Sequence, residues 1–243
     1  LYPFLLDKWH KTGGTIQFGA PYIDDQAMGF YAGDLISVVG RPGLGKTWMM
    51  LSSALKNWRG GSDGTPKRIG FVSMEVLAEL IMQRLAAMDF GIPFKVMQEG
   101  MASKLMIPDG AGSLVTTDPK KDLKAKLTTL EGHDTPLYII DGNLAASVDD
   151  VIAFAQMEQL DAIYIDGAYL LKNDKAKGPY DAVALNAPRL KSDLATNLKM
   201  PVFCSWQFGR EATKLKKGET PGLQHIGYSD TIGQLSSVVM GLF

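Results

Sequence analysis

Short apolar runs alternate along the chain with longer segments in which apolar residues recur at helical spacing. The apolar runs occupy residues 35–39, 68–74, 137–140, 162–165, 201–206 and 237–243, and the helical segments occupy residues 48–58, 76–88, 148–160 and 180–198. Strands buried on both faces of a sheet read as nearly continuous apolar runs, and helices connect them when they run parallel. The pattern therefore predicts an α/β fold, with a mainly parallel twisted sheet and helices on both faces.

The region between the second and third apolar runs is less regular. One face of the helix predicted for residues 76–88 is apolar and consists of Leu77, Leu80, Ile81, Leu85 and Met88. Residues 120–131 indicate a short charged helix. Residues 91–119 follow neither the helical nor the strand period, so the sequence leaves their structure open.

Length and composition fit one globular domain. The chain has 243 residues with 46% hydrophobic content, which is enough for a well-buried core. We expect residues 31–243 to form this domain and residues 1–30 to form a linker or docking segment. Within that segment, the apolar stretch 2–6 and Trp9 are candidates for docking on a neighbouring subunit, and packing on the chain's own core is the alternative.

Charge, cysteine content and hydropathy exclude several classes of protein. The formal net charge of -1 argues against a protein that coats nucleic acid, so any polynucleotide contact would come from local patches. The one cysteine, Cys204, lies in an apolar run and is expected to be a buried thiol, as in a reducing compartment. Because no apolar stretch has transmembrane length, we expect a cytoplasmic protein with no membrane segment. The chain does not begin with Met, so we expect a fragment or a processed product.

A phosphate-binding loop follows the first apolar run and precedes a helical segment. Its residues are Gly40, Arg41, Pro42, Gly43, Leu44, Gly45, Lys46 and Thr47, with Trp48 directly after it. This is the complete pattern of such a loop between a strand and a helix, the context in which the pattern is specific. Glycines let backbone N–H groups approach a phosphate, and the helix N-terminus favours an anion.

The polar residues of the loop suit a bound nucleotide with a metal ion. Lys46 is expected to reach the β- and γ-phosphates, and the hydroxyl of Thr47 to bind Mg²⁺. The sequence therefore predicts ATP and Mg²⁺ as ligands. The alternative is a glycine-rich turn with an incidental Lys-Thr pair.

Two of the predicted strands end in carboxylates. Asp166 follows residues 162–165, and a carboxylate there would hold Mg²⁺ through water beside Thr47. Glu75 follows residues 68–74, and it would polarise the water that attacks the γ-phosphate. Each residue has an alternative interpretation. Asp166 would then be an ordinary strand-end residue that caps a turn, and Glu75 would be a helix N-terminal residue that favours the helix dipole.

A cluster of basic residues follows the fifth apolar run. It consists of Arg210, Lys214, Lys216 and Lys217, with Gly218 and Pro221 as breakers. Such a loop would pair with the phosphates of single-stranded DNA. A solvated charged loop is the alternative, and charge alone does not decide between them.

Several motifs of the chain together resemble the DnaB-type replicative helicase family, and they follow one another in the family's order. They lie at residues 40–47 with Arg41 and Pro42, at 73–76 around Glu75, at 165–166, at 201–210 with Gln207, and at 232–239. Within the last motif, the sequence at residues 234–236 is similar to that of phage primase-helicases. Gly167, Ala168 and Tyr169 depart from the family, which usually has Tyr-Leu-Gln after the metal-binding Asp.

The resemblance implies a RecA-like ATPase domain that acts at the interfaces of a ring, expected to be a hexamer, and translocates on single-stranded DNA. It implies that Glu75 is the catalytic base and that Gln207 senses the γ-phosphate. It supports the basic cluster as a DNA contact, and it implies a primase or a helicase loader as a partner. It also implies a bacterial or phage-infected cell as the setting. The family's arginine finger would lie beyond Phe243.

Two other functions use the same fold. A recombinase of the RecA or RadA type, or a KaiC-like ATPase, would form filaments or rings without unwinding DNA. A module that binds nucleotide without hydrolysing it is the third possibility, and the intact set of polar residues argues against it.

Overall fold

A six-stranded parallel sheet forms the centre of the protein in the computed structural model, which describes residues 16–99, 105–108, 114–130, 133–141, 146–215, 218–228 and 230–243. The strand order is β5-β2-β6-β7-β1-β8, and every pair is parallel. The strands are β1 (Leu35–Gly40), β2 (Ile69–Ser73), β5 (Leu137–Asp141), β6 (Ala162–Asp166), β7 (Val202–Trp206) and β8 (Val238–Leu242). The predicted strands and the predicted fold class are therefore confirmed.

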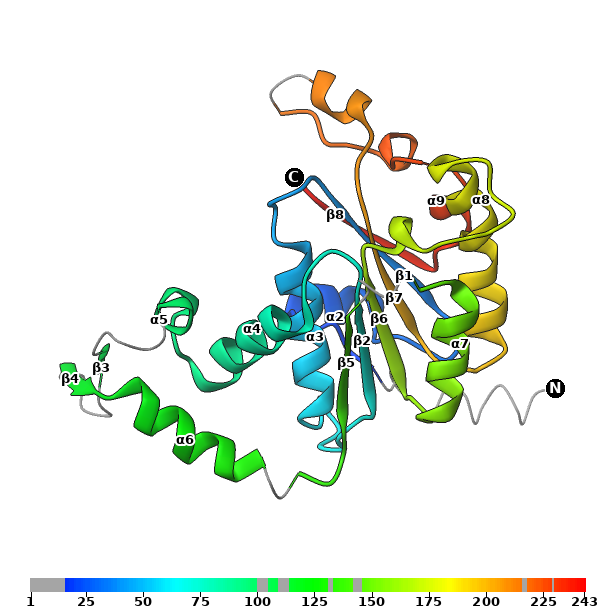
Figure 1. Ribbon diagram of the computed structural model, residues 1–243. Helices are drawn as coiled ribbons and strands as arrows, with labels where there is room; N and C mark the ends of the chain where they lie inside the picture. Colours follow the sequence, from blue (N-terminus) through cyan, green and yellow to red (C-terminus); the bar gives the residue numbers. More distant parts are fainter. Residues whose placement is uncertain are drawn as a thin grey trace.

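Helices cover both faces of the sheet (Figure 1). On one face lie α2 (Pro21–Ala27), α3 (Lys46–Trp58) and α4 (Ala78–Phe90). On the other lie α7 (Val148–Met157), α8 (Pro179–Arg189), the π-helix η3 (Leu190–Thr196) and α9 (Thr231–Leu235). Alternate residues of each strand point to opposite faces, so each strand contributes to both layers of the core.

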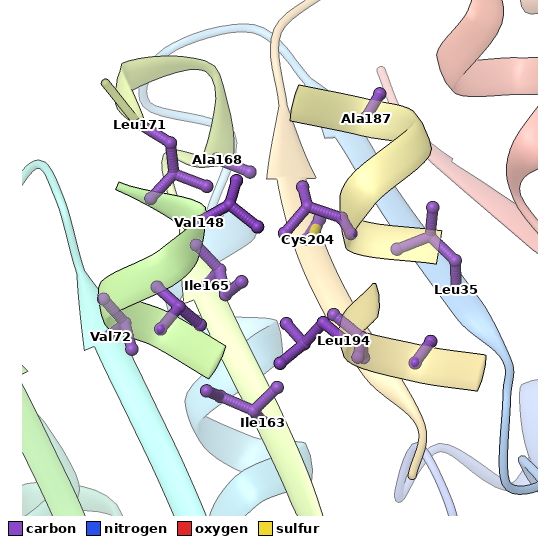
Figure 2. Packing of buried hydrophobic residues seen from close by; sticks show 14 of the residues in the cluster. Leu35, Val72, Val148, Ile163, Ile165, Ala168, Leu171, Ala187, Leu194 and Cys204 are labelled. Atoms are coloured by element: carbon purple, nitrogen blue, oxygen red, sulfur yellow. The ribbon is translucent and has the colours of Figure 1, made fainter. Parts of the chain in front are cut away.

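The two faces carry separate apolar clusters. Figure 2 shows one of them, in which Ile163, Ile165 and Cys204 of the sheet pack against Val148 and Leu194 of the helices. On the opposite face, residues such as Ile36, Tyr164 and Phe203 pack against α3. Cys204 is fully buried, and burial raises the pKa of its thiol, which confirms the prediction of a buried cysteine.

Two of the predicted helices differ from the structure in ways that particular residues explain. The helix predicted from residue 76 begins at Ala78, because the Ser73 hydroxyl bonds the backbone of Val76 and holds residues 73–76 in a turn. Leu77 is therefore 49% exposed, whereas Ile81 and Leu85 are buried as predicted.

The helix predicted for residues 180–198 changes its hydrogen-bond pattern partway along. Pro188 lies inside α8 and has no N–H to donate, and the helix continues as the π-helix η3 from Leu190. A missing donor interrupts the regular bonding of an α-helix, and a π-helix is one way to restore it.

The segment whose structure the sequence left open contains short elements. They are α5 (Phe94–Gln98) and a two-stranded antiparallel sheet of β3 (Leu105–Pro108) and β4 (Leu114–Thr117). The charged helix is α6 (Pro119–Leu130), close to its predicted bounds. The described residues also contain three short 3-10 helices, namely η2 (Ala168–Leu170), η4 (Arg210–Lys214) and η5 (Leu223–His225).

Part of the predicted docking segment joins the core. Ile16 forms an antiparallel bridge with Phe30, and Ile16 and Phe18 are buried on the face of the sheet that carries α3. The candidate docking residues 2–6 and Trp9 lie outside the described residues, and the domain boundary at residue 30 stays a prediction. No helix within the described parts of the chain is long and apolar enough to cross a membrane.

Candidate nucleotide site

The phosphate loop joins β1 to α3 at the carboxyl end of the sheet (Figure 1). Gly43 has a φ of 82° and Gly45 a φ of 91°, a backbone region that residues with a Cβ seldom adopt. Gly45 is the N-cap of α3, which has no side-chain cap, so the first N–H groups of this helix remain for another acceptor. An anion is the acceptor that a helix N-terminus favours.

Lys46 is buried against the loop that carries it. Its Nζ donates to the carbonyl oxygens of Gly40 and Arg41, at 3.0 and 3.2 Å, and the residue is 6% exposed. Burial lowers the pKa of Lys46, while the charges of Glu75 and Asp166 act in the opposite direction. An ammonium group is therefore held at the sheet edge by neutral carbonyls and by two nearby carboxylates.

Asp166 connects the end of β6 to the phosphate loop. Its Oδ2 accepts a hydrogen bond from Thr47 Oγ1 at 2.7 Å, and its Oδ1 accepts one from Ser205 Oγ at 2.8 Å. Ser205 lies on β7, the strand between β6 and β1, and accepts in turn from the N–H of Gly167 at 2.6 Å. Asp166 is 1% exposed, and these hydroxyls satisfy a carboxylate that would otherwise be costly to bury.

Thr47 and Asp166 are suitable ligands for Mg²⁺. Mg²⁺ takes oxygen ligands and is usually held by one or two protein groups together with water and substrate phosphates. The hydroxyl and the carboxylate are already within hydrogen-bond distance of each other, next to the loop. Residues present in the structure therefore fit a magnesium ion shared with a nucleotide.

Glu75, Tyr169 and Gln207 form a hydrogen-bonded chain along the same edge. The Tyr169 hydroxyl donates to Glu75 Oε1, and Gln207 Nε2 donates to the Tyr169 hydroxyl. These residues follow β2, β6 and β7, which are neighbours in the sheet. Burial is the main cause that raises the pKa of Tyr169, and its bond to Glu75 adds to the shift.

Gly167 makes room for this chain. Its φ is 88°, and a Cβ at this position would lie 3.0 Å from Cγ of Glu75. The departure from the family pattern at this position thus lets the backbone after Asp166 pass close to Glu75.

The structure brings Lys46, Thr47, Glu75, Asp166 and Gln207 to one edge of the sheet, as the sequence predicts. Their chemical roles stay predictions. The outer loop residues Arg41, Pro42, Gly43 and Leu44 are exposed.

Trp48 is packed against other side chains. Its ring meets the ring of Phe94 edge to face, with 5.3 Å between the centroids, and the guanidinium of Arg84 lies 5.5 Å from its centroid. A contact between Trp48 and a nucleotide stays a prediction.

Sequence reasoning did not identify Ser205 or Tyr169 as part of the site. Ser205 had a signal, because it is a polar residue inside an otherwise apolar run. Tyr169 stood out only as one of the residues that depart from the family pattern, because its contacts are with residues 94 and 38 positions away.

The predicted basic loop is only partly described. Gly209 N donates to His225 O at 2.8 Å, and Phe208 pairs with Ile226, so these backbone contacts close the segment between them. Lys214 Nζ lies 2.7 Å from Glu211 Oε1, and both side chains are 70% exposed. Lys216, Lys217 and the side chain of Arg210 lie outside the described residues. Figure 1 shows η4, which carries Lys214, beyond the end of β7.

Residues 15–243 match the family of the DnaB-like helicase C-terminal domain. The chain is 26% identical over 241 residues to the replicative DNA helicase DnaB of Rickettsia prowazekii (strain Madrid E), covering 94% of this chain and 46% of the relative. It is 29% identical over 235 residues to the replicative DNA helicase DnaB of Treponema pallidum (strain Nichols), covering 93% and 47%. The chain thus spans less than half the length of these curated relatives.

Solved structures show the same fold. The ATPase domain of G40P aligns with a TM-score of 0.81 at 17% identity, covering 100% of this chain and 81% of that one. A DnaB-like replicative helicase, described with its interactions with primase, aligns with a TM-score of 0.78 at 16% identity, covering 97% and 55%.

Proposed function

The chain belongs to the family of the DnaB-like helicase C-terminal domain, and we propose that it is the ATP-hydrolysing motor of a replicative DNA helicase. The observation that carries this proposal is that the phosphate loop lies beside the polar residues that end the neighbouring strands. Thr47 bonds Asp166, and Glu75 is linked through Tyr169 to Gln207. A binding module would need the loop alone, whereas hydrolysis also needs a group that activates water.

Nucleotide binding would begin at the loop. The unpaired N–H groups at the start of α3 would donate to the β-phosphate. Lys46 Nζ would exchange the carbonyls of Gly40 and Arg41 for phosphate oxygens, which are stronger acceptors because they carry charge. Because Lys46 is 6% exposed, little water competes for its charge.

Thr47 and Asp166 would hold Mg²⁺ beside the β- and γ-phosphates, the first directly and the second through water. When bound, the ion neutralises charge on the phosphate oxygens. Ser205 orients Asp166 by donating to its other carboxylate oxygen, so the carboxylate is fixed before the nucleotide arrives.

Glu75 would act on the attacking water. Its side chain is exposed, and a carboxylate that accepts one bond from Tyr169 retains further lone pairs for a water molecule. Glu75 would take the proton of this water as its oxygen attacks the γ-phosphorus, and the bond from phosphorus to the bridging oxygen of ADP breaks. Gln207 would donate its amide to a γ-phosphate oxygen.

Asp166→Asn is expected to lower ATP turnover by about 10- to 100-fold and to weaken its dependence on Mg²⁺, because an amide is a poorer partner for the cation's water shell. Turnover measured across Mg²⁺ concentrations tests this. Asp161→Asn is the matched control, because Asp161 lies at the opposite end of the same strand and binds Arg68 N. An unchanged Mg²⁺ profile in Asp166→Asn would contradict the metal role.

The motor would act between subunits of a ring, a hexamer in our proposal, and move along single-stranded DNA. The names of the relatives as replicative DNA helicases support this reading over a recombinase or a KaiC-like ATPase. We further propose that the protein acts in the cytoplasm of a bacterial or phage-infected cell. We also propose that a primase or a helicase loader is its partner.

The basic loop supplies a test of DNA contact. Replacing Lys214, Lys216 and Lys217 with Ala is expected to weaken binding of single-stranded DNA. Each lost phosphate contact should reduce the slope of log affinity against log salt by roughly 0.7. Titrations with a labelled oligonucleotide at several salt concentrations measure both quantities.

A second triple variant controls for net charge. It replaces Lys120, Lys121 and Lys124 of α6, which are exposed and which Figure 1 places at the opposite end of the molecule from the basic loop. Equal slopes for the two triple variants would mean that the loop is an ordinary charged surface.

Negative-stain imaging with ATP and DNA separates closed rings, which we expect, from the filaments of a recombinase.

A further inference from the structure

We propose that Tyr169 is a positioning residue for hydrolysis, which fixes Glu75 and Gln207 relative to each other, and that Tyr228 supports its ring. This inference rests on the proposed ATPase activity. It adds a connection between two groups that would otherwise act separately, the one that activates water and the one that meets the γ-phosphate.

The donors and acceptors of this contact permit one arrangement. An ionised Glu75 can only accept hydrogen bonds, so the Tyr169 hydroxyl must be the donor of the hydrogen bond to Oε1. The lone pairs of that hydroxyl then accept from Gln207 Nε2. This turns the amide nitrogen of Gln207 toward Tyr169. The nitrogen carries two hydrogens, so the second remains for a γ-phosphate oxygen while the first holds Tyr169.

The ring of Tyr169 is fixed by its surroundings. Tyr169 is 8% exposed and stacks on Tyr228, with 5.2 Å between the ring centroids and 11° between the planes. The ring of Tyr180 also lies near Tyr228, with 5.3 Å between the ring centroids. A hydroxyl on a buried, stacked ring loses little freedom when it binds Glu75 and Gln207, so it can hold them at low entropic cost.

The backbone ties Tyr228 to the same chain of contacts. Gly227 N donates to Gln207 O at 2.8 Å, so the residue before Tyr228 is bonded to the residue that contacts Tyr169. Tyr228 has a φ of 76°, which is uncommon for a residue with a side chain. The backbone thus holds a costly conformation in which the ring of Tyr228 supports Tyr169.

Tyr169→Phe removes the hydroxyl and keeps the ring. We expect kcat for ATP to fall by about 10- to 100-fold, the usual cost of a hydrogen bond to a charged group. The affinity for a fluorescent ATP analogue should stay within about 3-fold, because Tyr169 does not touch the phosphate loop in our account. Tyr22→Phe, on an exposed tyrosine of α2, is the matched control and should behave as the parent.

Two further sets of variants separate positioning from packing. Tyr228→Phe should keep the stack and most of the turnover, whereas Tyr228→Ala should lower kcat as Tyr169→Phe does. In a Gln207→Ala background, Tyr169→Phe should cost less than it does alone, because the two side chains share one contact. Thermal unfolding of each variant reports whether the fold is intact.

Several outcomes would overturn the inference, and the last of them would also overturn the proposed function. If the parent hydrolyses ATP and Tyr169→Phe keeps its kcat within about 2-fold, well below the loss of such a bond, Tyr169 only packs. The same conclusion follows if kcat and nucleotide affinity fall together, or if the losses from Tyr169→Phe and Gln207→Ala multiply. If the parent itself shows no turnover, the proposed function fails and this inference fails with it.

Discussion

Lys46→Ala is expected to abolish ATP turnover, with a loss of about 1000-fold or more, while the fold stays intact. Lys46 is the charged donor of the phosphate loop, and in a largely buried setting its charge acts strongly on phosphate oxygens. The fold should survive, because burial lowers the pKa of Lys46 and the charge is therefore held at a cost. Turnover by phosphate release and circular dichroism measure the two parts of the prediction.

Lys191→Ala is the matched control for Lys46→Ala. Lys191 Nζ also donates to a backbone carbonyl, that of Gly33 at 2.8 Å, and to Ser237 Oγ, and Gly33 precedes the start of β1 rather than its end. We expect Lys191→Ala to hydrolyse ATP as the parent does. Turnover of Lys46→Ala within a few-fold of the parent would rule out the phosphate-loop assignment.

Glu75→Gln is expected to bind ATP normally and to lose hydrolysis by about 10²- to 10⁴-fold, the usual contribution of a general base. The amide keeps the length of the side chain, and its oxygen still accepts from Tyr169. It cannot take a proton from water. Nucleotide affinity and turnover, measured on the same preparation, separate the two effects.

Glu79→Gln makes the same chemical change nearby. Glu79 is also exposed, but it lies in the first turn of α4 and not at the end of β2. It should leave both binding and turnover unchanged. A loss of ATP affinity in Glu75→Gln as large as its loss of turnover would mean that Glu75 supports the site structurally.

The parts of this protein that could be predicted from its sequence depend on short-range patterns. The buried strands β1, β2, β6 and β7 are nearly continuous apolar runs, so their positions followed from hydropathy. The loop before Lys46 is a local motif, and its neighbours along the chain place it at the sheet edge. Parallel strands bring their carboxyl ends together, which is why Asp166 was expected beside Thr47.

Other features depend on contacts between distant parts of the chain. The start of α4 follows from a turn at Ser73, and the π-helix follows from Pro188 within a helical period. The link from Glu75 through Tyr169 to Gln207 joins segments that follow three different strands. Neither hydropathy nor spacing encodes such a contact, because it depends on the register of the sheet and on the close approach at Gly167.

The fate of ATP bound to the protein tests the central claim most directly. With protein in excess of radiolabelled ATP and Mg²⁺ present, each nucleotide is bound once and its conversion to ADP is followed over time. We predict that the parent converts bound ATP to ADP, and that Glu75→Gln binds the same ATP and leaves it intact over the same period. Bound ATP that stays intact on the parent protein, or that Glu75→Gln hydrolyses at the parent's rate, would contradict this account.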